Sequence, residues 1–155
     1  MLSKELQEFI EKNIGLIEAN NYDVKTGLYN EAFKAHIEPG ELTDALLTAG
    51  IDPLEHLDYI PWRYLAYNKQ FKEFHIPDNI TSIGTGAFFA SSIKTLYIPR
   101  SVKVFGEECF SSSNIETILF DGTRHDFMLV SDHGASNKEI NIVTKDSTFD
   151  FWGEW

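Results

Sequence analysis

FKEFHIPDNITSIGTGAFFASS (residues 71–92) is followed without a gap by IKTLYIPRSVKVFGEECFSSSN (residues 93–114), and the two segments align over their whole length. A repeat with a fixed period indicates stacked units, because one such unit can bury its apolar side only against a neighbour. Nine aligned pairs carry the pattern: Phe71 with Ile93, Phe74 with Leu96, Ile76 with Ile98, Pro77 with Pro99, Ile80 with Val102, Ile83 with Phe105, Gly84 with Gly106, Ala87 with Cys109 and Phe88 with Phe110.

The period continues on both sides of these two units. IETILF (residues 115–120) opens a third unit, and NKEINI (residues 137–142) begins 22 residues later. Between them, DGTRHDFMLVSDHG replaces the proline, the glycine and the Ala-Phe pair, as expected of a capping coil. Upstream, residues 60–70 have the pattern of a shortened first coil, in which Tyr64 takes the position of Ala87.

These units resemble the BspA-type leucine-rich repeat, whose pattern is a strand ending in Ile-Pro, a hydrophobic residue, Ile-Gly, and then Ala-Phe with a turn. The segment from Phe120 to Thr123, followed by Phe127, is also similar to the closing segment of this family. The resemblance covers about residues 60–145. It implies a solenoid that serves as a scaffold for many kinds of recognition, and a bacterial or phage accessory protein as the source.

Stacked coils place equivalent residues in columns at a strand spacing of about 4.8 Å. Proline after each strand ends the pairing because it lacks an N–H donor. Gly84 and Gly106 are expected to allow a backbone turn that a side chain would obstruct. With a constant period, one interior column contains Phe74, Leu96, Ile118 and Ile140.

Residues 1–58 have the periodicity of helices rather than strands. Apolar residues spaced by three and four predict a first helix, with Ser3 as its N-cap. A second helix is expected within residues 22–37, where Gly27 disfavours an early start. The apolar stripe of the first helix contains Leu6, Phe9, Ile10, Ile14 and Ile17.

A third helix is expected to end at Gly50, and Asp52, Pro53 and Glu55 form the signal for another helix start. These helices should cover the open first coil, because an exposed solenoid end presents unpaired strand edges. The sequence thus predicts an α+β fold with a helical cap at residues 1–58 and a solenoid with a C-terminal cap at residues 59–155. The buried stripe of the third helix is expected to contain Leu42, Ala45, Leu46 and Ala49.

The composition excludes several classes of protein. The 155 residues carry a net charge of −11 without a basic stripe, which disfavours direct binding of nucleic acid. The single cysteine, Cys109, cannot form an intrachain disulfide. Neither a secretion signal nor an apolar run of about 20 residues is evident, so no membrane association and a cytoplasmic location are expected.

The polar clusters do not predict an enzyme or a cofactor. His125, Asp126, Asp132 and His133 are potential metal ligands in the divergent coil, but their loop is expected to be solvated. Cys109 has the position of a small buried residue, which makes a thiol inert. We therefore predict no catalytic residue, no metal site and no cofactor.

A candidate binding face follows from the alternation of the strands. If Phe74 and Ile76 point inward, the residues between and before them point outward, and the repeat continues these two outward columns. A flat face with large, partly apolar side chains often marks recognition, and the alternative is that it packs on the helices or on a second copy. The predicted site for a protein partner contains Glu73, His75, Thr95, Tyr97, Thr117 and Leu119.

Two aromatic groups lie outside this pattern. Most of the first group, Trp62, Tyr64 and Tyr67, is expected to be core. The second group belongs to the tail FDFWGEW (residues 149–155), which is expected to fold back onto the last coil, with docking on a partner as the alternative.

The leading hypothesis for function is a non-catalytic protein-binding module. A second hypothesis is an acidic inhibitor that binds the basic surface of an enzyme that processes nucleic acid or acts in defence. A third is a structural protein that forms a homodimer or larger assembly through the strand face or the tail.

Overall fold

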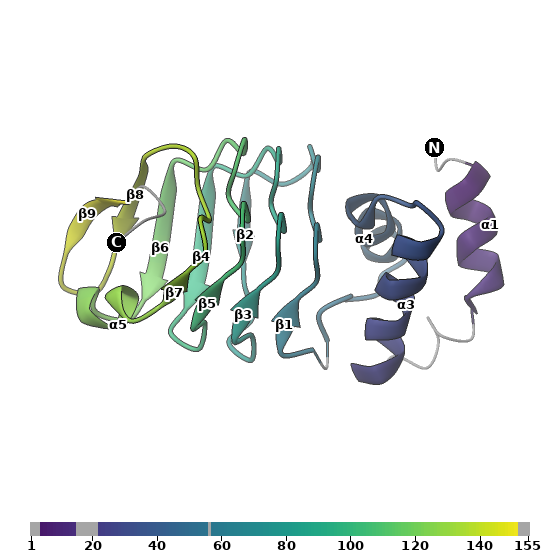
Figure 1. Ribbon diagram of the computed structural model, residues 1–155, viewed down its shortest axis with the longest axis horizontal. Coiled ribbons are helices and arrows are strands. Elements are labelled where there is room, and N and C mark those ends of the chain that lie inside the picture. Colours follow the sequence, from purple (N-terminus) through teal and green to yellow (C-terminus); the bar gives the residue numbers. More distant parts are fainter. Residues whose placement is uncertain (1–3, 15–21, 56, 152–155) are drawn as a thin grey trace.

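The computed structural model describes residues 4–14, 22–55 and 57–151. The described helices before the repeats lie at one end of an elongated solenoid, and the chain winds away from them toward the C-terminal end (Figure 1). The helices are α1 (Lys4–Lys12), α3 (Tyr22–Lys34) and α4 (Pro39–Thr48), and a short helix, α5 (Arg124–Met128), lies near the far end.

Each coil of the solenoid contributes strands to two sheets. One sheet contains the parallel strands β1 (Tyr59–Ile60), β3 (Ser82–Ile83), β5 (Val104–Phe105) and β7 (Ser131–Asp132) in that order. The other contains β2 (Glu73–His75), β4 (Thr95–Pro99), β6 (Thr117–Asp121), β8 (Ile140–Val143) and β9 (Thr148–Phe151), and only β9 is antiparallel to its neighbour. The predicted α+β solenoid with parallel ladders is confirmed.

The predicted register is confirmed for the central coils and is wrong for the last one. Phe74 pairs with Leu96, and Leu96 pairs with Ile118, as the 22-residue period requires. Ile118, however, pairs with Ile142 instead of Ile140. The third coil, which contains α5, is two residues longer than the period, and an even insertion keeps apolar residues on the interior face.

The glycines after β3 and β5 are required by the close approach of successive coils. A β-carbon on Gly84 would lie 2.6 Å from the Ile60 carbonyl oxygen, and one on Gly106 would lie 2.7 Å from the Ile83 carbonyl oxygen. Neither glycine has a positive φ, so the expected turn is not the reason for glycine. The residues with a positive φ lie after these glycines in the coil and recur at equivalent positions. They are Arg63, Gly86 and Glu108, and then Tyr67, Ala90 and Ser112.

The helical cap agrees in most respects with the prediction. Leu6 and Phe9 of α1 are buried, whereas Ile14 is 48% exposed; Ser3 and Ile17 lie outside the described residues. Helix α3 lies within the expected range, with Gly27 inside it. In α4, Leu42, Ala45 and Leu46 are buried, Ala49 is exposed, and Gly50 ends the helix with a φ of 80°.

The predicted helix start at Asp52 is wrong, because the segment forms only a turn. The Asp52 side chain accepts a hydrogen bond from the Leu54 N–H at 2.9 Å, as an N-cap would. Strand β1 begins at Tyr59, so there is no length for a second turn of helix. Instead, the side chains of Leu54 and Leu57 are buried. The side-chain amide of Asn79 donates a hydrogen bond to the Leu57 carbonyl oxygen.

The cap is joined to the first coil by polar and steric contacts of α4. The Arg63 guanidinium donates to both carboxylate oxygens of Glu38, at 2.8 and 3.1 Å. A β-carbon on Gly40 would lie 2.3 Å from the Ala66 carbonyl oxygen, so the helix rests directly on the coil backbone. The buried residues form one continuous core from Leu6 to Phe151.

The C-terminal end is closed by α5 and β9. Thr123 begins α5 with a capping box, in which Thr123 and Asp126 each accept a hydrogen bond from the other's backbone N–H. Phe151 is 1% exposed and its ring contacts Phe105 and Phe127. The fold-back of the tail is thus confirmed for Phe149 and Phe151, while Trp152 and Trp155 lie outside the described residues.

Candidate functional site

The predicted outward columns are present on the sheet that begins with β2. Glu73, Thr95 and Thr117 are adjacent across β2, β4 and β6, and His75, Tyr97 and Leu119 are adjacent in the same way. Leu96 and Ile118, which alternate with these residues along the strands, are fully buried. The structure therefore brings all six predicted site residues together on one face.

The two aromatic residues of this face are in direct contact. The rings of His75 and Tyr97 lie parallel, with their centroids 3.8 Å apart and an interplanar angle of 7°. His75 is 65% exposed, and its Nε2 lies 3.9 Å from a carboxylate oxygen of Glu73. The stacked pair forms a rigid, flat platform, because each ring limits the rotation of the other.

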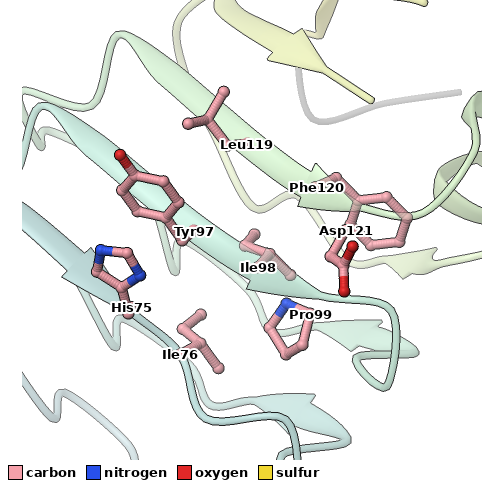
Figure 2. A pocket seen from close by; sticks show the side chains of 8 residues that line it. All are labelled: His75, Ile76, Tyr97, Ile98, Pro99, Leu119, Phe120 and Asp121. Atoms are coloured by element: carbon pink, nitrogen blue, oxygen red, sulfur yellow. The ribbon is translucent and has the colours of Figure 1, made fainter. Parts of the chain in front are cut away.

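A shallow hollow of about 400 Å³ extends from this platform toward the carboxyl ends of the strands. Figure 2 shows that His75, Tyr97 and Leu119 follow one another along one side of it, with Asp121 at the end of β6. The lining combines apolar surface with the imidazole, the phenol and one carboxylate, so the hollow offers both packing and hydrogen bonding. The remaining lining residues are Ile76, Ile98, Pro99 and Phe120.

Sequence reasoning missed the fourth member of each column. Asn141 lies beside Thr117, and Val143 lies beside Leu119, so both columns continue onto β8. A constant period places Glu139 and Asn141 there instead, and the two-residue insertion in the third coil was the missing information. The apolar pattern of INIV, residues 140–143, does not carry that signal, because an even shift leaves Ile140 and Ile142 on the buried side in both registers.

The side chains of the polar clusters are engaged in the fold itself. Cys109 is fully buried, and burial is the main cause that raises the pKa of its thiol well above the usual range. Among the described residues, no group of three or more histidine, cysteine, aspartate or glutamate side chains is arranged to hold a metal ion. Asp126 and Asp132 instead accept hydrogen bonds from nearby backbone N–H groups.

The expectation that most of the junction aromatics are core is wrong for two of three. Tyr64 is 1% exposed, but Trp62 and Tyr67 are 39% and 52% exposed. The coil register explains the difference, because only Tyr64 has the interior position of Ala87. The backbone hydrogen bonds between Leu65 and Ala87 and between Tyr67 and Phe89 fix this register.

A comparison with family models matches residues 52–129 to the model described as "BspA type Leucine rich repeat region (6 copies)". The chain belongs to the BspA-type leucine-rich repeat family. The match runs from the turn at Asp52 through α5, and the strands β7, β8 and β9 lie beyond it. No curated protein and no solved structure matches the chain.

Leucine-rich repeat proteins of this kind are generally modules for protein interaction, and that general class applies to this chain. Within the part of the chain that the structure describes, no helix is long and apolar enough to cross a bilayer.

Proposed function

We propose that this BspA-type protein is a non-catalytic module that binds a protein partner through the outward face of β2, β4 and β6. The observation that carries the proposal is the stacked pair of His75 and Tyr97, which lies beside Leu119 and an open hollow. Aromatic side chains that are held rigid on a flat surface favour binding, because little conformational entropy is lost when a partner covers them.

The alternation along the strands supports the same assignment. The inward residues of these strands satisfy the core, so nothing in the packing of the solenoid requires large side chains on the outer face. A face that served only solubility would carry charged residues, as the loops of this chain do. The six proposed contact residues remain Glu73, His75, Thr95, Tyr97, Thr117 and Leu119, and we add Asn141 and Val143.

The test is affinity capture with mass spectrometry, using the wild-type chain and a double variant, His75→Asp with Tyr97→Asp. Two carboxylates in place of the platform should abolish partner capture, because they would be desolvated beneath the partner. The matched control is Ser82→Asp with Ser131→Asp, which adds the same charge to the other sheet. Both variants must keep the circular dichroism of the wild type. Full retention of the captured partner by the platform variant would overturn the proposal.

Self-association through this face is a competing use of the same surface. A homodimer would bury the platform against a second copy and would also be lost in the double variant. Light scattering at high concentration distinguishes a homodimer from binding of a different protein. A chain that stays monomeric and still captures a partner does not use this face for self-association.

The proposal of an acidic inhibitor draws support from another surface. Glu41 and Asp44 line a hollow of about 290 Å³ together with Tyr67 and with Glu38, whose charge is paired with that of Arg63. Such an acidic concavity would attract a basic protein surface. Capture that is insensitive to salt and recovers no nucleic-acid-binding protein would remove this alternative. The division into a cap at residues 1–58 and a solenoid at residues 59–155, the non-catalytic role and the cytoplasmic location are likewise proposals.

A further inference from the structure

We propose that a second site, between α3 and the first coil, binds an alkylammonium group in an aromatic hollow. The hollow has a volume of about 350 Å³, at the small end of the range of about 300–1,000 Å³ for ligand sites. It shares no lining residue with the hollow on the strand face, so this proposal does not depend on the function proposed above. Its lining residues are Tyr29, Asn30, Phe33, Tyr59, Pro61 and Trp62.

Two aromatic walls of this hollow are exposed without a structural reason. Phe33 is 60% exposed and Trp62 is 39% exposed, although burial of such a side chain stabilises a fold by about 1.5–3 kcal/mol. Their rings meet nearly at right angles, with centroids 5.0 Å apart and an interplanar angle of 82°. Both rings line the hollow, so a ligand there meets aromatic side chains from α3 and from the first coil, as in the aromatic cages that hold quaternary ammonium groups.

The base of the hollow is held in place by the core. The Thr43 hydroxyl donates to the Pro39 carbonyl oxygen, so the Tyr29 hydroxyl donates to Thr43 Oγ1, at 2.6 Å. That hydroxyl is therefore not available to bind an anion. Burial is the main cause that raises the pKa of Tyr29, and the nearby carboxylate of Asp52 contributes to the same shift. Both effects keep the phenol neutral, and the Asp52 carboxylate favours a positive ligand over a negative one.

The charge around the hollow favours a cation. The chain carries a net charge of −11, and the nearest described guanidinium, Arg63, is neutralised by its two hydrogen bonds to Glu38. Arg63 already lies over the Trp62 ring, 5.8 Å from its centroid, which shows that this indole accepts a cation on its π surface. An uncharged apolar ligand would gain only the contact area, whereas an alkylammonium ion adds the attraction of the ring quadrupoles.

The ligand chemistry has two possible sources, a small free cation of the choline type and a methylated lysine of a protein. The first probe is choline, and its matched control is the neutral isostere in which a quaternary carbon replaces the nitrogen. The readout is the indole N–H signal of Trp62 in heteronuclear NMR spectra, which is assigned by its loss in Trp62→Phe among the signals of the 3 tryptophans. We expect choline to shift this signal in a saturable way and the isostere to bind about fivefold more weakly or not at all. An equal response to the two probes, or no response to choline, would overturn the proposal.

Asn30 provides variants that separate binding from folding, because its side chain lines the hollow and is exposed. Asn30→Asp should tighten choline binding about fivefold, and Asn30→Lys should weaken it by a similar factor, since a charge at about 4 Å in water is worth about 1 kcal/mol. Phe33→Ala should remove most of the binding, while Leu129→Ala, at an exposed apolar position next to α5, should not change it. Identical affinities in the Asp and Lys variants would contradict a cation site.

A short peptide containing trimethyllysine distinguishes the two sources. If the peptide binds more tightly than free choline, flanking residues contribute and the physiological ligand is a protein side chain. If choline binds at least as tightly, the ligand is a small cation. Either result requires the aromatic hollow, and both are abolished by Phe33→Ala if the proposal is correct.

Discussion

Gly106 lies against the backbone of Ile83 in the preceding coil, so that a β-carbon on Gly106 would be only 2.7 Å from the Ile83 carbonyl oxygen. The Gly106 backbone N–H donates a hydrogen bond to the same carbonyl oxygen at 2.8 Å, so the two backbones cannot move apart without losing it. We expect Gly106→Ala to lower the free energy of unfolding by about 1–3 kcal/mol or more, because the coils must separate. Urea denaturation measures the change. Gly134→Ala is the control, since nothing surrounds that position and only its positive φ opposes a side chain; an equal or larger loss at Gly134 would contradict this account.

Phe127 is the central ring of the C-terminal closure. It is fully buried and its ring contacts those of Phe105, Phe120, Phe149 and Phe151. Phe127→Ala should lower the free energy of unfolding by about 3–5 kcal/mol, because a cavity forms among four aromatic rings. Met128→Ala, at an exposed position of the same helix, should change it by less than about 0.5 kcal/mol. Similar losses in the two variants would mean that α5 does not close the core.

The pair of Glu38 and Arg63 fastens the helical cap to the first coil. Because the side chains are 28% and 22% exposed, the bidentate interaction is only partly screened by solvent. A double-mutant cycle with Glu38→Gln and Arg63→Lys should give a coupling energy of about 1 kcal/mol, since lysine cannot form the two parallel hydrogen bonds. The coupling should shrink in 1 M salt, where the Debye length is about 3 Å. A coupling energy of zero at low salt would show that the cap is held by apolar contacts alone.

The stability of the C-terminal cap should fall in acid. The Thr123 backbone N–H donates to Asp126, and this hydrogen bond is the first cause that lowers the pKa of Asp126 below its ordinary value of 3.8. The Arg124 backbone N–H lowers the pKa of Asp146 in the same way. Because the folded pKa is below the unfolded one, the stabilisation is complete above the ordinary value and is lost as the pH falls through the folded value.

Unfolding measured between pH 5 and pH 2 checks this sign. Asp126→Asn and Asp146→Asn should each flatten the loss of stability in acid. Asp44 is the control with the opposite sign, because burial raises its pKa and the folded state therefore favours its protonated form. Asp44→Asn should make the loss in acid steeper; a flatter profile would show that the three carboxylates were assigned wrongly.

The thiol of Cys109 should be inert in the folded protein. It is fully buried at the position of Ala87, and its raised pKa leaves little thiolate at neutral pH. An aromatic disulfide reagent should therefore react slowly with the native chain and rapidly in denaturant. Reaction of the native chain at the rate of a free thiol would show that the second and third coils open readily.

The repeat made the central part of the fold predictable. Within residues 71–120 the strand, proline, glycine and Ala-Phe positions recur at a constant spacing, and backbone sterics leave one way to stack them. The outward columns follow from alternation alone, so the sequence is sufficient to name six of the residues proposed for the strand face.

The sequence-based prediction was wrong where the repeat spacing changed, and where the following strand or turn decided the local structure or the direction of a side chain. The signal at Asp52 is a valid helix start by local rules, but β1 at Tyr59 allows only a turn. Trp62 and Tyr67 are aromatic, and composition favours burial, yet the turn of the first coil directs both outward.

The sequence by itself determined that the chain is a stack of coils with a helical start, because a constant period and alternating apolar residues are properties of the residues alone. Only the tertiary structure decided which side chains meet across coils: Ile118 with Ile142, His75 stacked on Tyr97, and Phe33 against Trp62. These contacts join residues far apart in the chain, and their geometry depends on the length of each coil and on how α3 and α4 rest on the first one. No local sequence pattern encodes which of these residues meet, because their separation in space depends on every turn of the chain between them.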